Sequence, residues 1–478
     1  MTLADETRWL DAIDQAALVA AGEVNPLELM EAAIERIEND DASLNAVPIR
    51  WFDEARDHAA NLPPGGPLRG VPFLVKDLGL QMLGHPLTEG NAALARELPR
   101  SEFNAKLLDR YIESGLVIAG RTASSELGTM PVTETDAYGA TRNPWDLDRT
   151  PGGSSGGAAA AVARGLVPIA HGSDGGGSIR IPAACCGLFG LKPSQGRITM
   201  EPDRSEAAPG VDHVLTRSVR DSAVALDATH GPGVGDLIRA PAPRRRFIDE
   251  VGTDPGRLRI GLLDRHPHGG HADDEVIAAT VDAAGLLESL GHHVEQSHPS
   301  GFDDAEAPAL YGMLRAPAIA HAVDRIGERV GHPLRDDELQ GTNRIQAELG
   351  RAVTAVQMVE AEEATTRLRR DTQRWWSDGW DLLLTPTLAE LPLRIGTIDA
   401  NAEDPMQSLF RAGAFVPFTP LFNTTGQPAV SIPLYWTDQG IPVGVQLVAA
   451  YGREDLLLQV SAQLEEARPW AHRRPAAV

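Results

Sequence analysis

The sequence predicts an α/β fold, in which helices pack on a β-sheet. Short apolar runs that suit buried strands alternate with segments of helical periodicity along most of the chain. The apolar run from Gly70 to Asp77 is followed by a helical segment from Ser101 to Ser114 and by a second apolar run from Leu116 to Gly120. Residues 155–164 are mostly Gly and Ala, and side chains this small allow a helix to pack closely on a sheet.

The N-terminal part is predicted to be helical. Residues 5–22 read as one helix. A second helix should begin at Asn25 as its N-cap, with Pro26 at the first helical position, and apolar residues follow at helical spacing as far as Ile37. We expect these helices to pack on the body of the protein or on a partner subunit.

The remaining elements follow from the same periodicities. Helices are predicted at 155–164, 218–229, 274–290 and 454–466, with a long helical region over 304–379 and a helical turn over 178–185. Strands are predicted at 166–170, 188–191, 258–263, 293–295, 381–385, 429–434 and 443–448. Residues 200–257 are expected to be irregular outside the helix at 218–229. No internal repeat or clear linker interrupts this order, so we expect one elaborated domain over residues 1–478.

Composition narrows the class of protein. The chain has 478 residues, 42% hydrophobic and 23% charged, and a net charge of −24. This charge argues against general binding to nucleic acid or to an anionic membrane, since phosphate contacts need clustered Lys and Arg. Cys185 and Cys186 are adjacent and are the only cysteines, which excludes a disulfide scaffold. The acidic N-terminus and the absence of a long apolar run favour a cytoplasmic enzyme without a membrane span.

Two glycine-rich loops that carry serines suggest a catalytic site. The first loop is Gly152–Gly157 and the second is Asp174–Ser178. Glycine lets another group approach main-chain N–H donors closely. Flexible linkers are the alternative, but linkers repeat Gly and Ser without the apolar elements that separate these two loops.

The first loop also matches the pattern G-x-S-x-G, through Gly152, Ser154 and Gly156. That pattern marks a nucleophilic serine only when a buried strand leads directly into it. Here the preceding residues, 146–151, are mostly polar and end in Pro151. We therefore disfavour Ser154 as the nucleophile.

Ser178 has the better context for a nucleophile. A strand ends near Ala170, and Gly175, Gly176 and Gly177 then offer successive N–H groups that can stabilise an oxyanion. No histidine lies in a motif that would make it the base. Lys76 follows a buried apolar run, where burial favours its neutral form, so it is the candidate base, and the Ser154 hydroxyl can relay the proton.

A histidine cluster is the second candidate site. His266, His268 and His271 lie close to Asp273 and Asp274, and these residue types can bind a metal. The run is rich in Gly and Pro, so a mobile loop is favoured and no metal is expected.

The motifs resemble the amidase signature family. The resemblance rests on Gly-Gly-Ser-Ser-Gly-Gly, on Asp-x-Gly-Gly-Ser-Ile-Arg, whose serine, Ser178, lies 24 positions after Ser154, and on the upstream Val-Lys-Asp. The segments YGATRNPW, FNTTGQPAVSIPL and GVQLVAAYGREDLLLQV are most similar to the branch of cyclic-dimer hydrolases, aryl acylamidases and urethanases. The family has a large mixed β-sheet core flanked by helices on both faces. The resemblance implies an N-terminal helical part (1–62), a signature core (63–200), a variable substrate-pocket region (201–425) and C-terminal strands and helix (426–478).

The resemblance implies roles for named residues. Ser178 would be the nucleophile, Ser154 the cis-serine relay and Lys76 the base. The backbone amides of Gly175, Gly176, Gly177 and Ser178 would form the oxyanion hole, supported by Asp174, Arg180 and Ser155. The resemblance implies no metal and no cofactor.

The motifs indicate the substrate-binding residues less specifically than the catalytic residues. Ala123 stands where the family often has Asn, in Gly120-Arg-Thr-Ala-Ser-Ser-Glu126, so the family's specificity does not transfer directly. Trp375, Trp376 and Trp380 could line a pocket with Phe410 and Phe418, although their spacing also suits core packing. The candidate substrate-binding residues are Ala123, Ser124, Met130, Tyr138, Arg315 and Phe415.

The predicted activity is hydrolysis of a small amide: an acyl amide, an anilide or a cyclic amide. A carbamate could enter the same cycle. Two other interpretations are a glutaminase subunit of a tRNA-dependent amidotransferase and a non-catalytic anion-binding protein, although no phosphate-binding motif such as a Walker sequence is present. Whether the chain forms a homodimer is left open.

Overall fold

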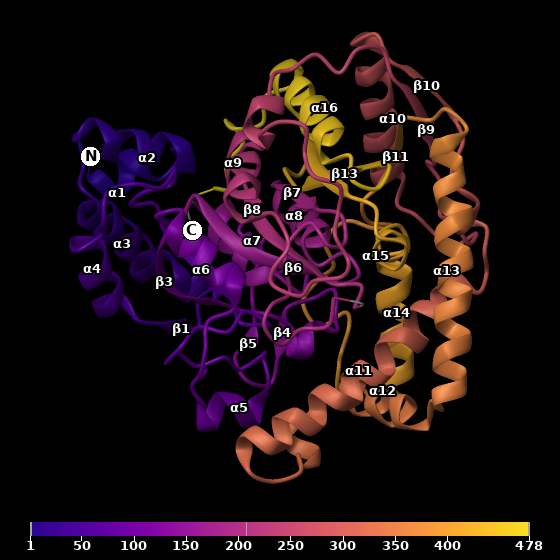
Figure 1. The fold of residues 1–478 in the computed structure, drawn as a ribbon, viewed down its shortest axis with the longest axis horizontal. Helices are drawn as coiled ribbons and strands as arrows, with labels where there is room; N and C mark the ends of the chain where they lie inside the picture. Colours follow the sequence, from indigo (N-terminus) through magenta and orange to yellow (C-terminus); the bar gives the residue numbers. More distant parts are fainter. Residues whose placement is uncertain (1, 207, 477–478) are drawn as a thin grey trace.

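An extended mixed β-sheet organises the fold (Figure 1). The computed structural model describes residues 2–206 and 208–476. Within these ranges eleven strands pair in the order β1-β3-β2-β6-β8-β7-β12-β13-β11-β9-β10, and β4 and β5 form a separate two-stranded sheet. The strands are β1 (Ile49–Arg50), β2 (Pro72–Lys76), β3 (Val117–Thr122), β4 (Glu134–Thr135), β5 (Gly139–Ala140), β6 (Ile169–Asp174), β7 (Phe189–Lys192), β8 (Val211–Thr216), β9 (Arg259–Leu262), β10 (His293–Gln296), β11 (Leu382–Pro386), β12 (Ala429–Trp436) and β13 (Pro442–Ala449).

Strand direction changes along the sheet, as in the mixed sheet that was predicted. β3, β2 and β6 are parallel neighbours, and so are β11, β9 and β10. Between these groups, β8, β7, β12 and β13 pair antiparallel. The parallel group matters for function because its strands end at one edge, where β2 delivers Lys76 and β6 delivers Asp174.

Both faces of the sheet are covered by helices. Along β2, Phe73 and Val75 enter one hydrophobic cluster and Leu74 enters another, because successive side chains of a strand point to opposite faces. The first cluster includes residues of α6, α9, α10 and α16, and the second includes residues of α3, α7 and α8. The α/β fold with helices on both faces is therefore confirmed.

The helices have the following bounds: α1 (Leu3–Thr7), α2 (Ala12–Ala21), α3 (Pro26–Leu44), α4 (Phe52–Ala60), α5 (Ala92–Glu97), α6 (Lys106–Glu113), α7 (Gly156–Ala163), α8 (Arg180–Cys186), α9 (Val219–Thr229), α10 (Asp274–Ser289), α11 (Ala307–Val330), α12 (Gly341–Ala352), α13 (Ala355–Ser377), α14 (Pro405–Phe415), α15 (Pro420–Thr425) and α16 (Glu454–Ala467). The long α13 runs along one side of the molecule, at the right in Figure 1, and α11 and α12 lie near the lower end of α13 in this view.

Several boundaries differ from the prediction. The single helix over 5–22 is two helices, because Asp11 caps a new one by accepting the Asp14 amide. Helix α6 begins after Ala105 rather than at Ser101, which instead forms an isolated bridge with Leu83. The strand predicted at 166–170 lies further along, at Ile169–Asp174.

Strand β8 was missed, because residues 200–257 outside α9 were expected to be irregular. It carries Asp212 and His213, both fully buried. Such polar residues are seldom fully buried, so their presence in the sequence does not predict a central strand. In the structure β8 joins β6 to β7 and so lies beside the strand that leads to the second glycine loop.

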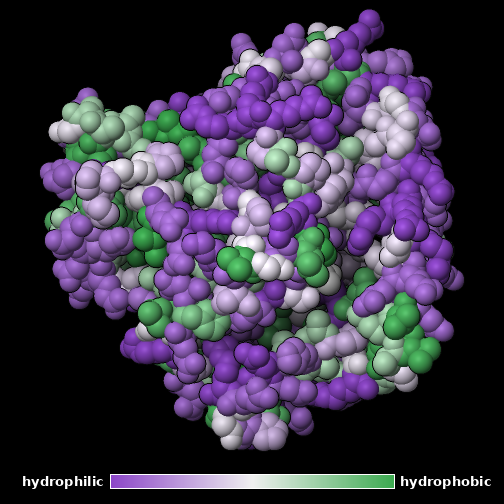
Figure 2. All heavy atoms as spheres, in the orientation of Figure 1, coloured by the Kyte–Doolittle hydropathy of each residue, from purple (hydrophilic) through white to green (hydrophobic). Residues whose placement is uncertain are grey.

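The face shown in Figure 2 is predominantly hydrophilic. Within residues 2–206 and 208–476, no helix is long and apolar enough to span a membrane.

Candidate active site

Lys76 lies at the end of β2 and contacts two serines. Its Nζ donates to Ser154 Oγ at 2.7 Å and to Ser173 Oγ at 2.9 Å. The Lys76 side chain is fully buried, and this burial lowers its pKa from 10.5 to about 7, because an ammonium group loses its hydration inside the protein. Near neutral pH a large share of Lys76 is therefore unprotonated and able to accept a proton.

Ser154 belongs to the first glycine loop, just before α7, and follows a cis peptide bond from Gly153. Glycine is required at Gly152 and Gly153, the two residues before Ser154. A Cβ on Gly153 would lie 2.7 Å from the Met130 carbonyl oxygen, and one on Gly152 would lie 2.9 Å from the Pro182 Cα of α8. The first loop is therefore packed against α8, the helix that follows Ser178.

Ser178 lies in the short segment between the end of β6 at Asp174 and the start of α8 at Arg180. The side chain is half-buried. Its hydroxyl makes no hydrogen bond to the part of the chain that the structure describes, so it is available to a substrate. The predicted order of strand, glycine loop and helix around Ser178 is confirmed, although the strand ends at Asp174 rather than near Ala170 and the helix begins at Arg180 rather than at Ser178.

The second glycine loop is fixed by a buried ion pair between Asp174 and Arg180. Arg180 Nη2 lies 2.9 Å from Asp174 Oδ1, and Nε lies 2.9 Å from Oδ2. Burial acts to raise the pKa of Asp174, but the charge and hydrogen bonds of Arg180, together with Lys192 and Asn423, outweigh burial and hold the pKa below its usual value. Both side chains have no exposed surface. The pair therefore links the end of β6 to the first turn of α8, on either side of the loop.

Asp174 also accepts the Gly177 amide at 2.7 Å through Oδ1. This hydrogen bond occupies the N–H group of Gly177 and argues against its predicted role as an oxyanion donor. The amides of Gly175, Gly176 and Ser178 make no hydrogen bond to the described residues and remain candidates.

A helix distant in sequence supports the same loop. The Thr419 hydroxyl, at the start of α15, donates to the Gly176 carbonyl at 2.7 Å, and Asn423 Nδ2 donates to the Asp174 carbonyl at 2.8 Å. Sequence reasoning missed both residues, although Asn423 lies inside the family-like stretch FNTTGQPAVSIPL and Thr419 lies three residues before that stretch begins. Ser155 supports the loop from the other side, because its Oγ accepts the Ser173 amide at 3.3 Å.

Three further residues around Lys76 were also missed. Ser173 is the second partner of its amine, and His171 Nδ1 accepts the Lys76 backbone amide at 3.3 Å. The other ring nitrogen of His171 lies 3.3 Å from Asp212 Oδ1. The available signal was the polar run His-Gly-Ser-Asp, which continues a buried strand directly into the glycine loop.

The structure places the candidate substrate-binding residues at several points. Arg315 is half-buried and lies over the ring of Tyr311, with its guanidinium carbon 5.0 Å from the ring centroid. Tyr311 donates to the Gly175 carbonyl at 3.0 Å, so this pair flanks the second glycine loop. Met130 and Ala123 are buried against the first loop and its helix, beside Gly153 and Gly157.

The other candidates lie among polar contacts or in the core. Ser124 is buried and donates to the Ser125 carbonyl. The Tyr138 hydroxyl lies 2.9 Å from Thr88 Oγ1. Phe415 is fully buried in the same hydrophobic cluster as Met130.

The tryptophans pack as core residues. Trp375 stacks on Trp380 with ring centroids 4.8 Å apart and meets Trp376 edge to face. Phe410, by contrast, is 71% exposed and lines no core. The histidine run forms no group of three metal-ligand side chains in the described ranges.

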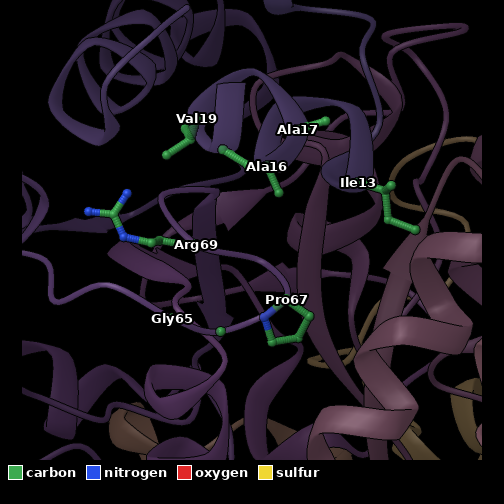
Figure 3. Close-up of a pocket in the computed structure, with 9 residues that line it drawn as sticks. Ile13, Ala16, Ala17, Val19, Gly65, Pro67 and Arg69 are labelled. Carbon is green, nitrogen blue, oxygen red and sulfur yellow. The ribbon is translucent and has the colours of Figure 1, made fainter. Parts of the chain in front are cut away.

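A cavity of about 400 Å³ lies elsewhere, between α2 and residues 65–69. Figure 3 shows Ile13, Ala16 and Val19 around it, with Pro67 on the loop side. It contains none of the predicted site residues.

A buried lysine that contacts a serine beside a rigid glycine loop fits the class of hydrolases with a serine nucleophile and a lysine base. The family profile described as Amidase matches residues 28–458. The chain belongs to the amidase signature family, and it is an amide hydrolase that acts on small molecules.

Known proteins resemble the chain over nearly its full length. It is 40% identical to 6-aminohexanoate-cyclic-dimer hydrolase of Paenarthrobacter ureafaciens, over 98% of this chain and 96% of that protein. A solved structure of 6-aminohexanoate cyclic dimer hydrolase superposes with a TM-score of 0.94 at 40% identity, covering 98% of this chain and 99% of the other. A bacterial aryl acylamidase of the amidase signature family matches with a TM-score of 0.88 at 29% identity, covering 98% of each chain.

Proposed function

We propose that the chain hydrolyses the C–N bond of a small cyclic amide through a Ser178–Ser154–Lys76 triad. The observation that carries the proposal is the contact between Lys76 Nζ and Ser154 Oγ inside a fully buried environment. A neutral amine next to a hydroxyl can draw a proton through that hydroxyl from a second serine.

In the acylation step, Ser178 Oγ attacks the carbonyl carbon of the substrate. Its proton passes to Ser154, whose own proton passes to Lys76. The negative charge on the carbonyl oxygen is stabilised by the amides of Gly175, Gly176 and Ser178, which the Asp174–Arg180 pair holds in place. The C–N bond then breaks, and the proton returns through Ser154 to the departing nitrogen, which leaves an ester on Ser178.

Water completes the cycle. It loses a proton along the same relay and attacks the ester carbonyl, and Ser178 leaves with a proton. The products are a carboxylic acid and an amine, which stay on one molecule when the substrate is cyclic. A cyclic amide is favoured as the substrate by the 40% identity to a hydrolase named for a cyclic dimer.

The test compares kcat/KM for 6-aminohexanoate cyclic dimer, an anilide, a linear aliphatic amide and an aryl carbamate. We expect the cyclic dimer to be hydrolysed most efficiently. A higher kcat/KM for the carbamate would assign a urethanase instead.

The nucleophile is tested separately. Ser178→Ala should lower kcat by at least about 10⁴-fold and abolish covalent labelling by a fluorophosphonate. Labelling that persists in Ser178→Ala and disappears in Ser154→Ala would exchange the roles of the two serines.

A further inference from the structure

A second cavity, of about 620 Å³, lies between α13 and the far end of α15. Three arginines of α13 line it, Arg369, Arg370 and Arg374, together with Gln373 one turn after Arg369. The opposite wall consists of Gln195, Ile238 and Tyr451 and of the end of α15, Thr425 and Gly426. The described lining residues include no Asp or Glu, in a chain whose net charge is −24.

The positive charge of this cavity is largely uncompensated. Arg374 pairs with Asp371. Arg369 and Arg370 form no ion pair or hydrogen bond with the residues that the structure describes, and both are exposed. Two guanidinium groups therefore offer up to ten N–H donors, and their geometry suits the two oxygens of a carboxylate.

The carboxylate that contacts the opposite wall is already engaged, because Glu206 accepts the backbone amides of Leu237 and Ile238. The Tyr451 hydroxyl donates to the Gln195 carbonyl at 2.6 Å, and Gln195 Nε2 donates to the carbonyls of Glu206 and Ala208. With these polar groups engaged, Ile238 and the ring of Tyr451 give this wall its apolar character. A ligand that suits both walls has an anionic head and an apolar body.

The cavity is distinct from the catalytic centre. Helix α15 contacts the loop that carries Ser178 through Thr419, at its N-terminal end, and through Asn423 in its interior, whereas it lines the cavity with Thr425 and Gly426 at its C-terminal end. None of the described residues that line the cavity belongs to the proposed triad or oxyanion hole.

We propose that this cavity is a second binding site, specific for a carboxylate-bearing organic anion. Arg369 and Arg370 bind the carboxylate, and Ile238 and Tyr451 contact the apolar part. Amide hydrolysis releases a carboxylate, so every turnover produces a molecule that carries the group bound by Arg369 and Arg370.

The test reads binding at the cavity itself. Ser377 lies on its rim and is exposed, whereas Cys185 and Cys186 are buried, so Ser377→Cys can be labelled selectively with an environment-sensitive fluorophore. Hexanoate is the probe, and hexan-1-ol is its neutral counterpart. We expect a saturable fluorescence change with hexanoate and none with hexan-1-ol.

Two variants test whether the fluorescence change with hexanoate depends on the arginines that line the cavity. Arg369→Gln with Arg370→Gln should weaken hexanoate binding at least about tenfold, which corresponds to about 1.4 kcal/mol. Arg367→Gln should change it less than about twofold, because Arg367 is another exposed arginine of α13 that pairs with Glu363 and does not line the cavity.

Two results would overturn the proposal. One is an unchanged affinity for hexanoate in the double variant, measured by the label and, on unlabelled protein, by calorimetry. The other is displacement of hexanoate by an equal concentration of inorganic phosphate, which would show that the apolar wall contributes nothing to recognition. Both arginines are exposed, and the melting temperature of the double variant verifies that it is folded.

Discussion

The Nζ of Lys76 lies 2.7 Å from the Oγ of Ser154, in a position where Lys76 has no exposed surface. The two residues are 78 positions apart in the chain. Their contact depends on β2, which carries Lys76 to the edge of the sheet, and on the first glycine loop, which is packed between Met130 and α8. This pair determines how the site should respond to pH and to substitution.

The pH dependence of kcat/KM should follow the ionisation of Lys76. Burial lowers its pKa to about 7, and only the unprotonated amine can act as the base, so the rate should rise as the pH increases through about 7 and then level off. Lys76→Arg should lose activity at every pH, because a guanidinium group is not deprotonated in this range.

A second lysine provides the control for this profile. Burial also lowers the pKa of Lys192 to about 7, but Lys192 donates to the Pro193 carbonyl and lies outside the triad. The inflection should therefore persist in Lys192→Met. If the inflection disappears in Lys192→Met, the ionisation near pH 7 belongs to Lys192 and not to Lys76.

Ser154 and Ser173 should differ in their effects although both contact Lys76. Ser154→Ala removes the proposed relay and should lower kcat about 10³-fold. Ser173→Ala leaves Lys76 in contact with Ser154 and should cost about tenfold or less in kcat. The measurement is single-turnover acylation. Equal losses in the two variants would contradict a relay through Ser154.

The second glycine loop should tolerate alanine at one position and not at the next. A Cβ on Gly176 would lie 2.0 Å from the Tyr311 hydroxyl, whereas one on Gly175 would meet only the Gly210 Cα, at 3.9 Å. Gly176→Ala should therefore lower kcat about 10²-fold through displacement of Tyr311 or of the loop. Gly175→Ala should stay within about threefold of the wild type, and a comparable loss in Gly175→Ala would show that steric contact is not the cause.

Breaking the Asp174–Arg180 pair should destabilise the fold as well as the site. Asp174→Asn leaves Arg180 buried without its counter-ion, which costs about 3–5 kcal/mol in the free energy of unfolding. Asp371→Asn is the matched control, because its pair with Arg374 is exposed and should contribute less than about 1 kcal/mol. Urea unfolding compares the two variants.

The same pair gives a pH dependence of stability. The folded-state pKa of Asp174 is held below its ordinary value of 3.8, so its contribution is fully present above that value and is lost as the pH falls further. The Asp174→Asn variant should therefore lose less stability than the wild type when the protein is acidified below about pH 4. An identical acid dependence in the two proteins would contradict this assignment.

Much of the site could be predicted from local sequence, because its parts are local. The run Asp174–Ser178 itself encodes a glycine turn that ends in the candidate nucleophile Ser178, although the strand before it was predicted to end at Ala170, and the apolar run before Lys76 predicts the burial of that lysine. The α/β alternation follows in the same way from periodicity, which needs only neighbouring residues.

The tertiary structure decided what depends on distant segments. Strand β8 was missed because its polar residues Asp212 and His213 are buried, and only their neighbours in the sheet make that burial tolerable. The engagement of the Gly177 amide by Asp174, and the support of the loop by Thr419 and Asn423, come from hydrogen-bond geometry. Residue types establish which groups are available for the chemistry, whereas the packing of the chain determines which donor meets which acceptor.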